Sequence, residues 1–152
     1  MKSFRITSDF EGLVKAFEAA PEKTKVMVKR QLKMAARDIQ ERASDHHRYT
    51  SRSETLERRG VIYRVEGTKV VLSLNPNVPY AVHVHEGTPP HIIEPQNKMA
   101  LRWVSRGEFA FAKRVNHPGI EKDPFLYDAA DHELPRIQSR FANALESLLG
   151  AL

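Results

Sequence analysis

Residues 60–87, "GVIYRVEGTKVVLSLNPNVPYAVHVHEG", decide the fold class of this chain. In residues 61–66 and 69–74 apolar side chains alternate with their neighbours, which is the two-residue period of a half-buried strand. The intervening "EGT" predicts a tight turn, so these two strands should form an antiparallel hairpin. After "NPNVP" the alternation resumes in residues 80–86 and predicts a third strand of the same meander.

Two long helices are predicted on either side of this meander. Residues 22–45 carry apolar side chains at helical spacing: Val28, Leu32, Ala35, Ile39 and Ala43. From Phe125 onward a second apolar stripe recurs every three or four residues, and Pro135 within it predicts a kink or a break near residues 131–135. Residues 99–115 predict either a further hairpin around "SRGE" or a short helix followed by a strand.

The expected architecture is therefore a single α+β domain over residues 1–152. An antiparallel sheet of about four strands is packed by a long N-terminal helix and a C-terminal helix. Residues 1–20 are expected to form an N-terminal arm with a short helix. The polar segment 46–55, "HHRYTSRSET", has no period and predicts a mobile loop.

Composition narrows the chemistry available to the chain. There is no cysteine, which excludes disulfides, thiolate zinc sites and cysteine nucleophiles. No 18 apolar residues occur in a row, so a membrane-spanning helix and a membrane partner are not expected. The formal net charge of +5 is compatible with a polyanionic neighbour.

Histidines cluster in residues 82–91, "VHVHEGTPPH". On a strand, His83 and His85 would share a face about 7 Å apart, while Glu86 would point to the other face. His91 follows two prolines, and zinc usually takes three or four protein ligands. The spacing favours polar strand residues over a metal site. The alternative of a metal-dependent hydrolase or nuclease using His83, His85 and Glu86 stays open.

Other catalytic signatures are missing from the sequence. It contains no G-x-S-x-G nucleophile elbow and no glycine-rich phosphate loop. The basic residues of 29–37 and of the segment "RSETLERR" fit a solvated surface, or one that contacts phosphates without reading bases. A basic nucleic-acid-binding module is therefore a second alternative. No catalytic residue, metal or cofactor is predicted.

Several motifs in order resemble one protein family. The segment 80–88, "YAVHVHEGT", resembles the "YA-x-x-V-H-E-G-T" signature of tail-completion proteins, the head–tail joining or neck proteins of long-tailed bacteriophages. Residues 91–95, 98–103 and 111–130 are similar to the closing pattern of that family, in which a histidine–proline–glycine loop leads to "PFL" and a final helix. The resemblance covers roughly residues 20–150. One departure is "SETL", which replaces the "TG-x-L" context before the first strand.

The resemblance implies roles for particular residues. His85 to Thr88 would end a strand and turn the chain, Pro118-Gly119 would form a second turn, and Phe125 with Leu126 would anchor the last helix to the sheet. The structural and interface residues implied in this way are His85, Glu86, Gly87, Thr88, His91, Pro118, Gly119, Pro124, Phe125 and Leu126.

The function implied by the resemblance is structural rather than enzymatic. It predicts a ring of copies, expected to be a hexamer, at the neck of a virion assembled in the bacterial host cytoplasm. The ring would contact a head–tail adaptor and a tail-terminator protein. Genome DNA would pass through the lumen without sequence specificity, and Arg52, Arg58 and Arg59 are the candidate DNA contacts.

Overall fold

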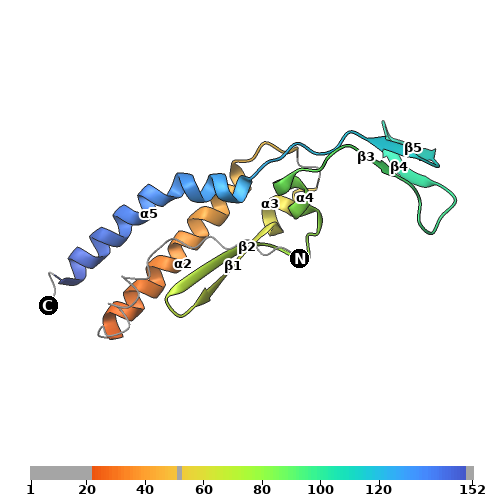
Figure 1. The fold of residues 1–152 in the computed structure, drawn as a ribbon. Coiled ribbons are helices and arrows are strands. Elements are labelled where there is room, and N and C mark those ends of the chain that lie inside the picture. The colour runs from red at the N-terminus through yellow and green to blue at the C-terminus, as the bar shows by residue number, and fades with distance from the viewer. Residues whose placement is uncertain (1–21, 51–52, 150–152) are drawn as a thin grey trace.

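The computed structural model describes residues 22–50 and 53–149. The N-terminal arm and short helix expected in residues 1–20 lie outside the described residues. Within them the chain folds as the predicted α+β domain, with antiparallel strands between a long N-terminal and a long C-terminal helix (Figure 1). None of the helices in these described ranges combines the length and apolar character needed to cross a membrane.

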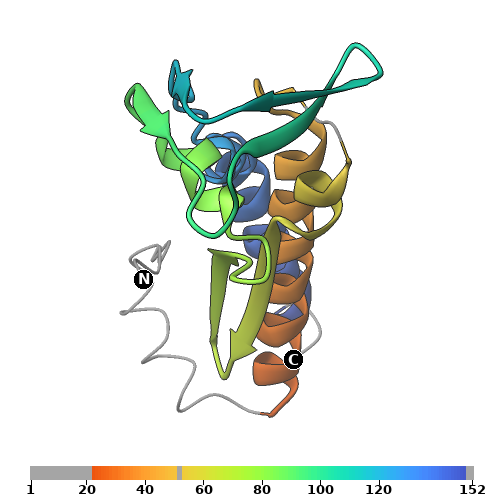
Figure 2. The ribbon, with the colours of Figure 1, turned by 90° about the vertical axis from the view of Figure 1, so that its right-hand side faces the viewer.

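We call the described residues outside 89–119 the body of the molecule. Two long helices lie side by side and form one layer of this body. Helix α2 spans Glu22–Asp45 and helix α5 spans Phe125–Leu149, as the sequence predicted (Figures 1 and 2). Small residues at the contact, including Ala36 and Ala129, let the two backbones approach closely. Ion pairs flank the apolar contact, because Arg140 reaches Asp38 and Arg42 lies 3.7 Å from Glu133.

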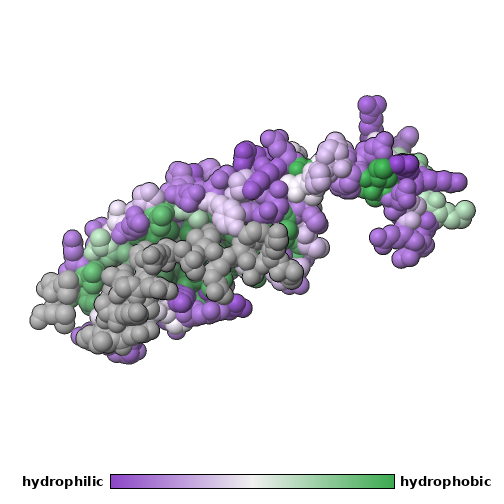
Figure 3. Space-filling view, in the orientation of Figure 1, coloured by the Kyte–Doolittle hydropathy of each residue, from purple (hydrophilic) through white to green (hydrophobic). Residues whose placement is uncertain are grey.

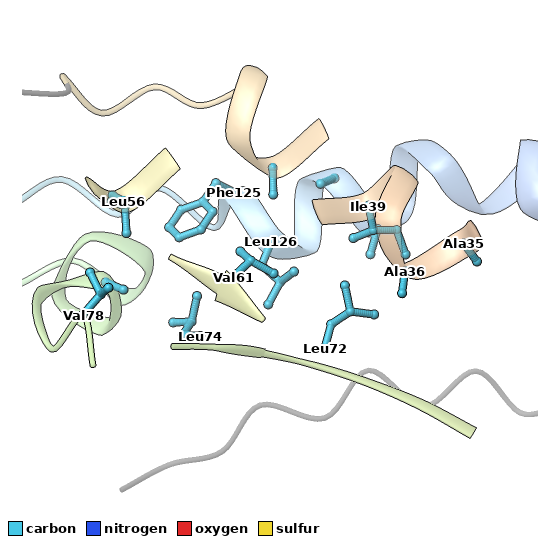
Figure 4. Close-up of a cluster of buried hydrophobic side chains, with 14 of the residues drawn as sticks. Ala35, Ala36, Ile39, Leu56, Val61, Leu72, Leu74, Val78, Phe125 and Leu126 are labelled. Carbon is cyan, nitrogen blue, oxygen red and sulfur yellow. The ribbon is translucent and has the colours of Figure 1, made fainter. Parts of the chain in front are cut away.

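A hairpin covers the helix pair and closes the hydrophobic core. Strand β1, Val61–Glu66, pairs with strand β2, Lys69–Leu74, through the predicted turn. Alternate residues of both strands face the helices, and the rest face outward. Figure 4 shows this inner face meeting both helices, with Val61 and Leu74 near Phe125 and Leu126 of α5, and Leu72 near Ala36 and Ile39 of α2.

The predicted third strand is wrong, because residues Tyr80–Glu86 form helix α4. The alternating "VHVH" imitates a strand, but the buried residues Val78, Ala81 and His85 recur at three and four residues. That spacing places them on one face of a helix. Pro79 precedes the first turn of α4, where its missing N–H leaves no hydrogen bond unmade.

The expected sheet of about four strands is also wrong. The described residues contain three separate two-stranded antiparallel sheets: β1–β2, β3–β6 and β4–β5. Strand β3 is His91–Ile93, β4 is Leu101–Ser105, β5 is Glu108–Ala112 and β6 is Val115–His117. Because α4 stands where a third strand was expected, β1–β2 ends as a lone hairpin. The hairpin alternative for residues 99–115 is the one that forms.

Two further expectations need correction. Helix α5 does not break near residues 131–135 but continues through Pro135, which lies on its exposed side, where water can satisfy the carbonyl left without a partner. The segment 46–55 is not simply a mobile loop. Its described part includes Tyr49, which packs against the core, and the start of helix α3, Thr55–Arg59. Residues 51–52 lie outside the described residues.

Replacing Phe125 by alanine tests whether this core depends on the start of α5. Phe125 is 1% exposed, so Phe125→Ala should lower the free energy of unfolding by about 3–5 kcal/mol. Tyr80→Ala removes an aromatic ring that is 41% exposed and should cost about 1 kcal/mol or less. Chemical denaturation of both variants gives the comparison, and equal costs would contradict this placement of the core.

Candidate functional site

Two segments that are distant in sequence, around Thr88 and Ile120, meet in space. Thr88 N donates to the carbonyl of Ile120 at 2.9 Å, and Ile120 N donates back to the carbonyl of Thr88 at 3.0 Å. The Thr88 hydroxyl oxygen accepts a further bond from Ile120 N at 3.1 Å. This isolated antiparallel bridge joins the end of α4 to the segment that leads into α5.

Glycine is required on both sides of this bridge. Gly87 has a φ of +74°, and a Cβ there would lie 2.9 Å from both Ile120 O and Lys122 N. Gly119 has a φ of +90°, and its Cβ would lie 2.3 Å from Thr88 O. Any other residue would face both a strained backbone and a collision with main-chain atoms. The two crossing segments are therefore packed backbone against backbone.

His85 lies beneath the bridge and is fully buried. Its ring meets Phe125 and Tyr127 edge-on, with centroids 5.2 and 4.7 Å away. Burial lowers the pKa of His85 below its ordinary value of 6.5, although the Glu86 carboxylate, 3.5 Å from Nδ1, opposes this effect. His85 is thus a neutral core residue that orders the start of α5.

Asp123 organises the same junction and was missed by sequence reasoning. Its carboxylate is 3% exposed and accepts backbone hydrogen bonds from Arg48 at 2.5 Å and Tyr49 at 2.8 Å. Its own N–H donates to the carbonyl of Val84 at 3.1 Å. Asp123 therefore ties the ends of α2 and α4 to the start of α5. An aspartate before a proline at a helix start is a capping signal that could have drawn attention to it.

Beyond the bridge the chain leaves the body and returns. Strands β3 and β6 continue the pairing outward, and the rings of His91 and His117 stack with centroids 4.8 Å apart. Pro118 precedes the Gly119 turn, and Pro124 immediately precedes Phe125, the first residue of α5. At the far end β4 and β5 form a hairpin, residues 101–112, that we call the distal hairpin (Figure 1).

The distal hairpin exposes large apolar side chains on both of its faces. The register places Val104, Phe109 and Phe111 on one face, where they are 64%, 61% and 65% exposed. Trp103 lies on the opposite face and is 41% exposed. Figure 3 shows hydrophobic atoms on this projection among hydrophilic ones. A two-stranded hairpin is marginally stable by itself, so this one is suited to completion by a partner.

The histidines do not converge on a metal site. His83 is exposed on α4 whereas His85 is enclosed by aromatic rings, so the two do not share an accessible face. His91 lies beyond the bridge, stacked on His117. In residues 22–50 and 53–149, no group of three or more histidine, aspartate or glutamate side chains is arranged to hold a metal ion.

The candidate DNA contacts are only partly described. Arg58 and Arg59 are exposed on the short helix α3, and Arg58 pairs with Glu54. Arg52 lies outside the described residues. Lys29, Lys33 and Arg37 line the exposed side of α2, which makes that helix face basic.

Comparisons with known proteins add no relative. No protein-family model, no curated protein and no solved structure matches this chain.

Two glycines allow the packing at the bridge to be measured separately from backbone strain. Gly119→Ala and Gly107→Ala both place alanine at a similar positive φ, +90° and +86°. No atom lies within 4 Å of a Cβ at Gly107, whereas a Cβ at Gly119 collides with Thr88 O. We expect Gly119→Ala to cost about 1–3 kcal/mol more than Gly107→Ala in denaturant unfolding. Similar costs would show that the two segments are not in contact at Gly119.

Acid should destabilise the body through His85. Because its pKa is lower in the folded than in the unfolded chain, the unfolded state binds more protons as the pH falls below about 6.5. The free energy of unfolding should therefore decrease from pH 7 to pH 5. In His85→Gln this decrease should be smaller, whereas His83→Gln, at an exposed position, should keep the wild-type dependence. Identical pH profiles for all three proteins would contradict the burial of His85.

Proposed function

We propose that this chain is a structural protein of the neck of a long-tailed bacteriophage. Copies of it form a ring, a hexamer, that joins the tail to the DNA-filled head. The observation that carries the proposal is the distal hairpin, which holds Val104, Phe109 and Phe111 in solvent on a projection from the body. Exposed apolar surface of this kind marks an interaction site. The function is therefore one of interfaces rather than of turnover.

The geometry of the bridge supports the same proposal. The segments that resemble tail-completion proteins, 80–88 and 111–130, are separate in sequence. They meet through Thr88 and Ile120, and the two glycines of the resemblance stand at positions that require glycine. A shared reason thus exists for finding "HEGT" and "HPG" in one chain: together they form the base from which the distal hairpin projects.

The proposed partners follow from the proposed place in the virion. The ring contacts a head–tail adaptor on one side and a tail-terminator protein on the other. The genome passes through its lumen, where weak, salt-dependent contacts suit a strand that must slide. The formal charge of +5 per chain becomes +30 for six copies, and Arg52, Arg58 and Arg59 are candidate lumen residues.

The proposal is tested by the mass of the purified protein and by the phage that lacks it. Native mass spectrometry should find a closed assembly, about 104 kDa for six copies of the 17.4 kDa chain. Infection by a phage without this chain should yield filled heads and complete tails that do not join. Joined particles in that infection would contradict the proposal, as would stoichiometric zinc accompanied by a hydrolytic activity that His83→Gln abolishes.

A further inference from the structure

We infer that the distal hairpin of one copy docks head-to-tail on the exposed side of helix α5 of a second copy, beside Asp128 and Asp131. The inference rests on the proposed function, since it specifies how the ring would be closed. It assigns the donor surface to the face that carries Val104, Phe109 and Phe111.

The donor surface is both apolar and cationic. The guanidinium of Arg102 lies over the ring of Phe109 at 4.7 Å and shares its face with Val104 and Phe111. Residues 94–114 contain five basic and two acidic residues, a net charge of +3. The basic residues of this segment are Lys98, Arg102, Arg106, Lys113 and Arg114. The complementary surface should therefore combine negative charge with some apolar area.

The two long helices differ in sign. Residues 22–45 of α2 carry seven basic and four acidic residues, a net charge of +3, which would repel the donor surface. Residues 125–149 of α5 carry four acidic and two basic residues, a net charge of −2. Asp128 and Asp131 are exposed one turn apart near the start of α5, and Asp128 also lies 3.4 Å from the guanidinium of Arg48 in its own chain. Leu134, 37% exposed on the next turn, supplies apolar area beside them.

The distal hairpin is placed away from helix α5 of its own copy. In Figure 1 strands β4 and β5 project outward from the end of the body at which α5 begins, and α5 runs away from them toward the opposite end. The bridge between Thr88 and Ile120 fixes the base of the projection. The helix face that meets the distal hairpin therefore belongs to a second copy.

The symmetry of such a contact agrees with a ring. The distal hairpin and α5 are different surfaces, so every copy offers one and accepts one. Repetition of a head-to-tail contact gives a ring when its rotation closes, as the proposed function requires, whereas a symmetric contact between two distal hairpins would stop at a dimer.

The test uses two variants of the full chain that each lose one half of the contact. In the donor variant, Phe109→Ser with Phe111→Ser, the apolar face is removed. In the acceptor variant, Asp128→Arg with Asp131→Arg, the sign of the α5 surface is reversed. Each variant alone should be monomeric, with self-association weakened about 100-fold or more. Circular dichroism and the melting temperature of each variant verify that the body is folded.

Mixing the two variants then decides the geometry. The donor variant keeps its α5 surface and the acceptor variant keeps its distal hairpin, so one contact can form but no second one. Native mass spectrometry of the mixture should show a heterodimer and no larger species. Met99→Ser and Glu146→Arg, which change an exposed apolar residue outside β4–β5 and an acidic residue near the other end of α5, should leave the ring intact.

Failure of this inference can be told apart from failure of the proposed function. If wild-type protein forms the ring and either variant still does so, the assigned contact is wrong and the ring survives. A mixture that stays monomeric also overturns the assignment, because the distal hairpin then docks elsewhere. If neither wild-type protein alone nor the neck of an intact virion contains a ring of this chain, the proposed function fails with it.

Discussion

The paired main-chain hydrogen bonds between Thr88 and Ile120 are the constraint on which the shape of this protein depends. They hold together the two ends of a projecting segment, residues 89–119. Without them, each end of this segment would be joined to the body only by the covalent chain. Gly87 and Gly119 permit this crossing because glycine has no Cβ, and neither position has room for one. Phe125 of the hydrophobic core follows Ile120 by five residues, so the paired segments are anchored next to the buried start of α5.

This arrangement separates the stable part of the molecule from the part that we propose meets partners. The body buries its apolar residues between α2, α5 and the β1–β2 hairpin. The distal hairpin leaves its own apolar residues largely in water, and covering each of them would contribute on the order of 1–2 kcal/mol. A free chain buries little of Phe109 and Phe111, whereas an assembled chain in which they were covered would gain that apolar burial. That asymmetry is the physical reason for proposing an assembly subunit.

Much of the body could be predicted from sequence because the segments with periodic apolar residues are long. Helix α2, the β1–β2 hairpin and the start of α5 were each predicted from apolar spacing, and the structure has them. Helix α4 could not be, because the four residues "VHVH" within this seven-residue segment satisfy the strand period as well as the helical one. Only tertiary burial of Ala81 and His85 on one face distinguishes the two.

The residues of the candidate site also fall into those that the sequence pointed to and those that it did not. The glycines at the bridge and the anchor Phe125 were singled out by motif, whereas Asp123 and Tyr49 were not. Their contact joins residues far apart in sequence, which no local pattern records. The exposure of Phe109 and Phe111 was equally invisible, since an alternating apolar strand predicts a buried face. Sequence periodicity shows that a face is apolar but not what covers it.

A cryo-EM map of the assembled neck is the measurement that tests the central claim most directly. The account predicts a ring of this chain between head and tail, with Phe109 and Phe111 of each copy buried against α5 of its neighbour. A neck in which the distal hairpin projects into solvent, or in which this chain forms no ring, would contradict it.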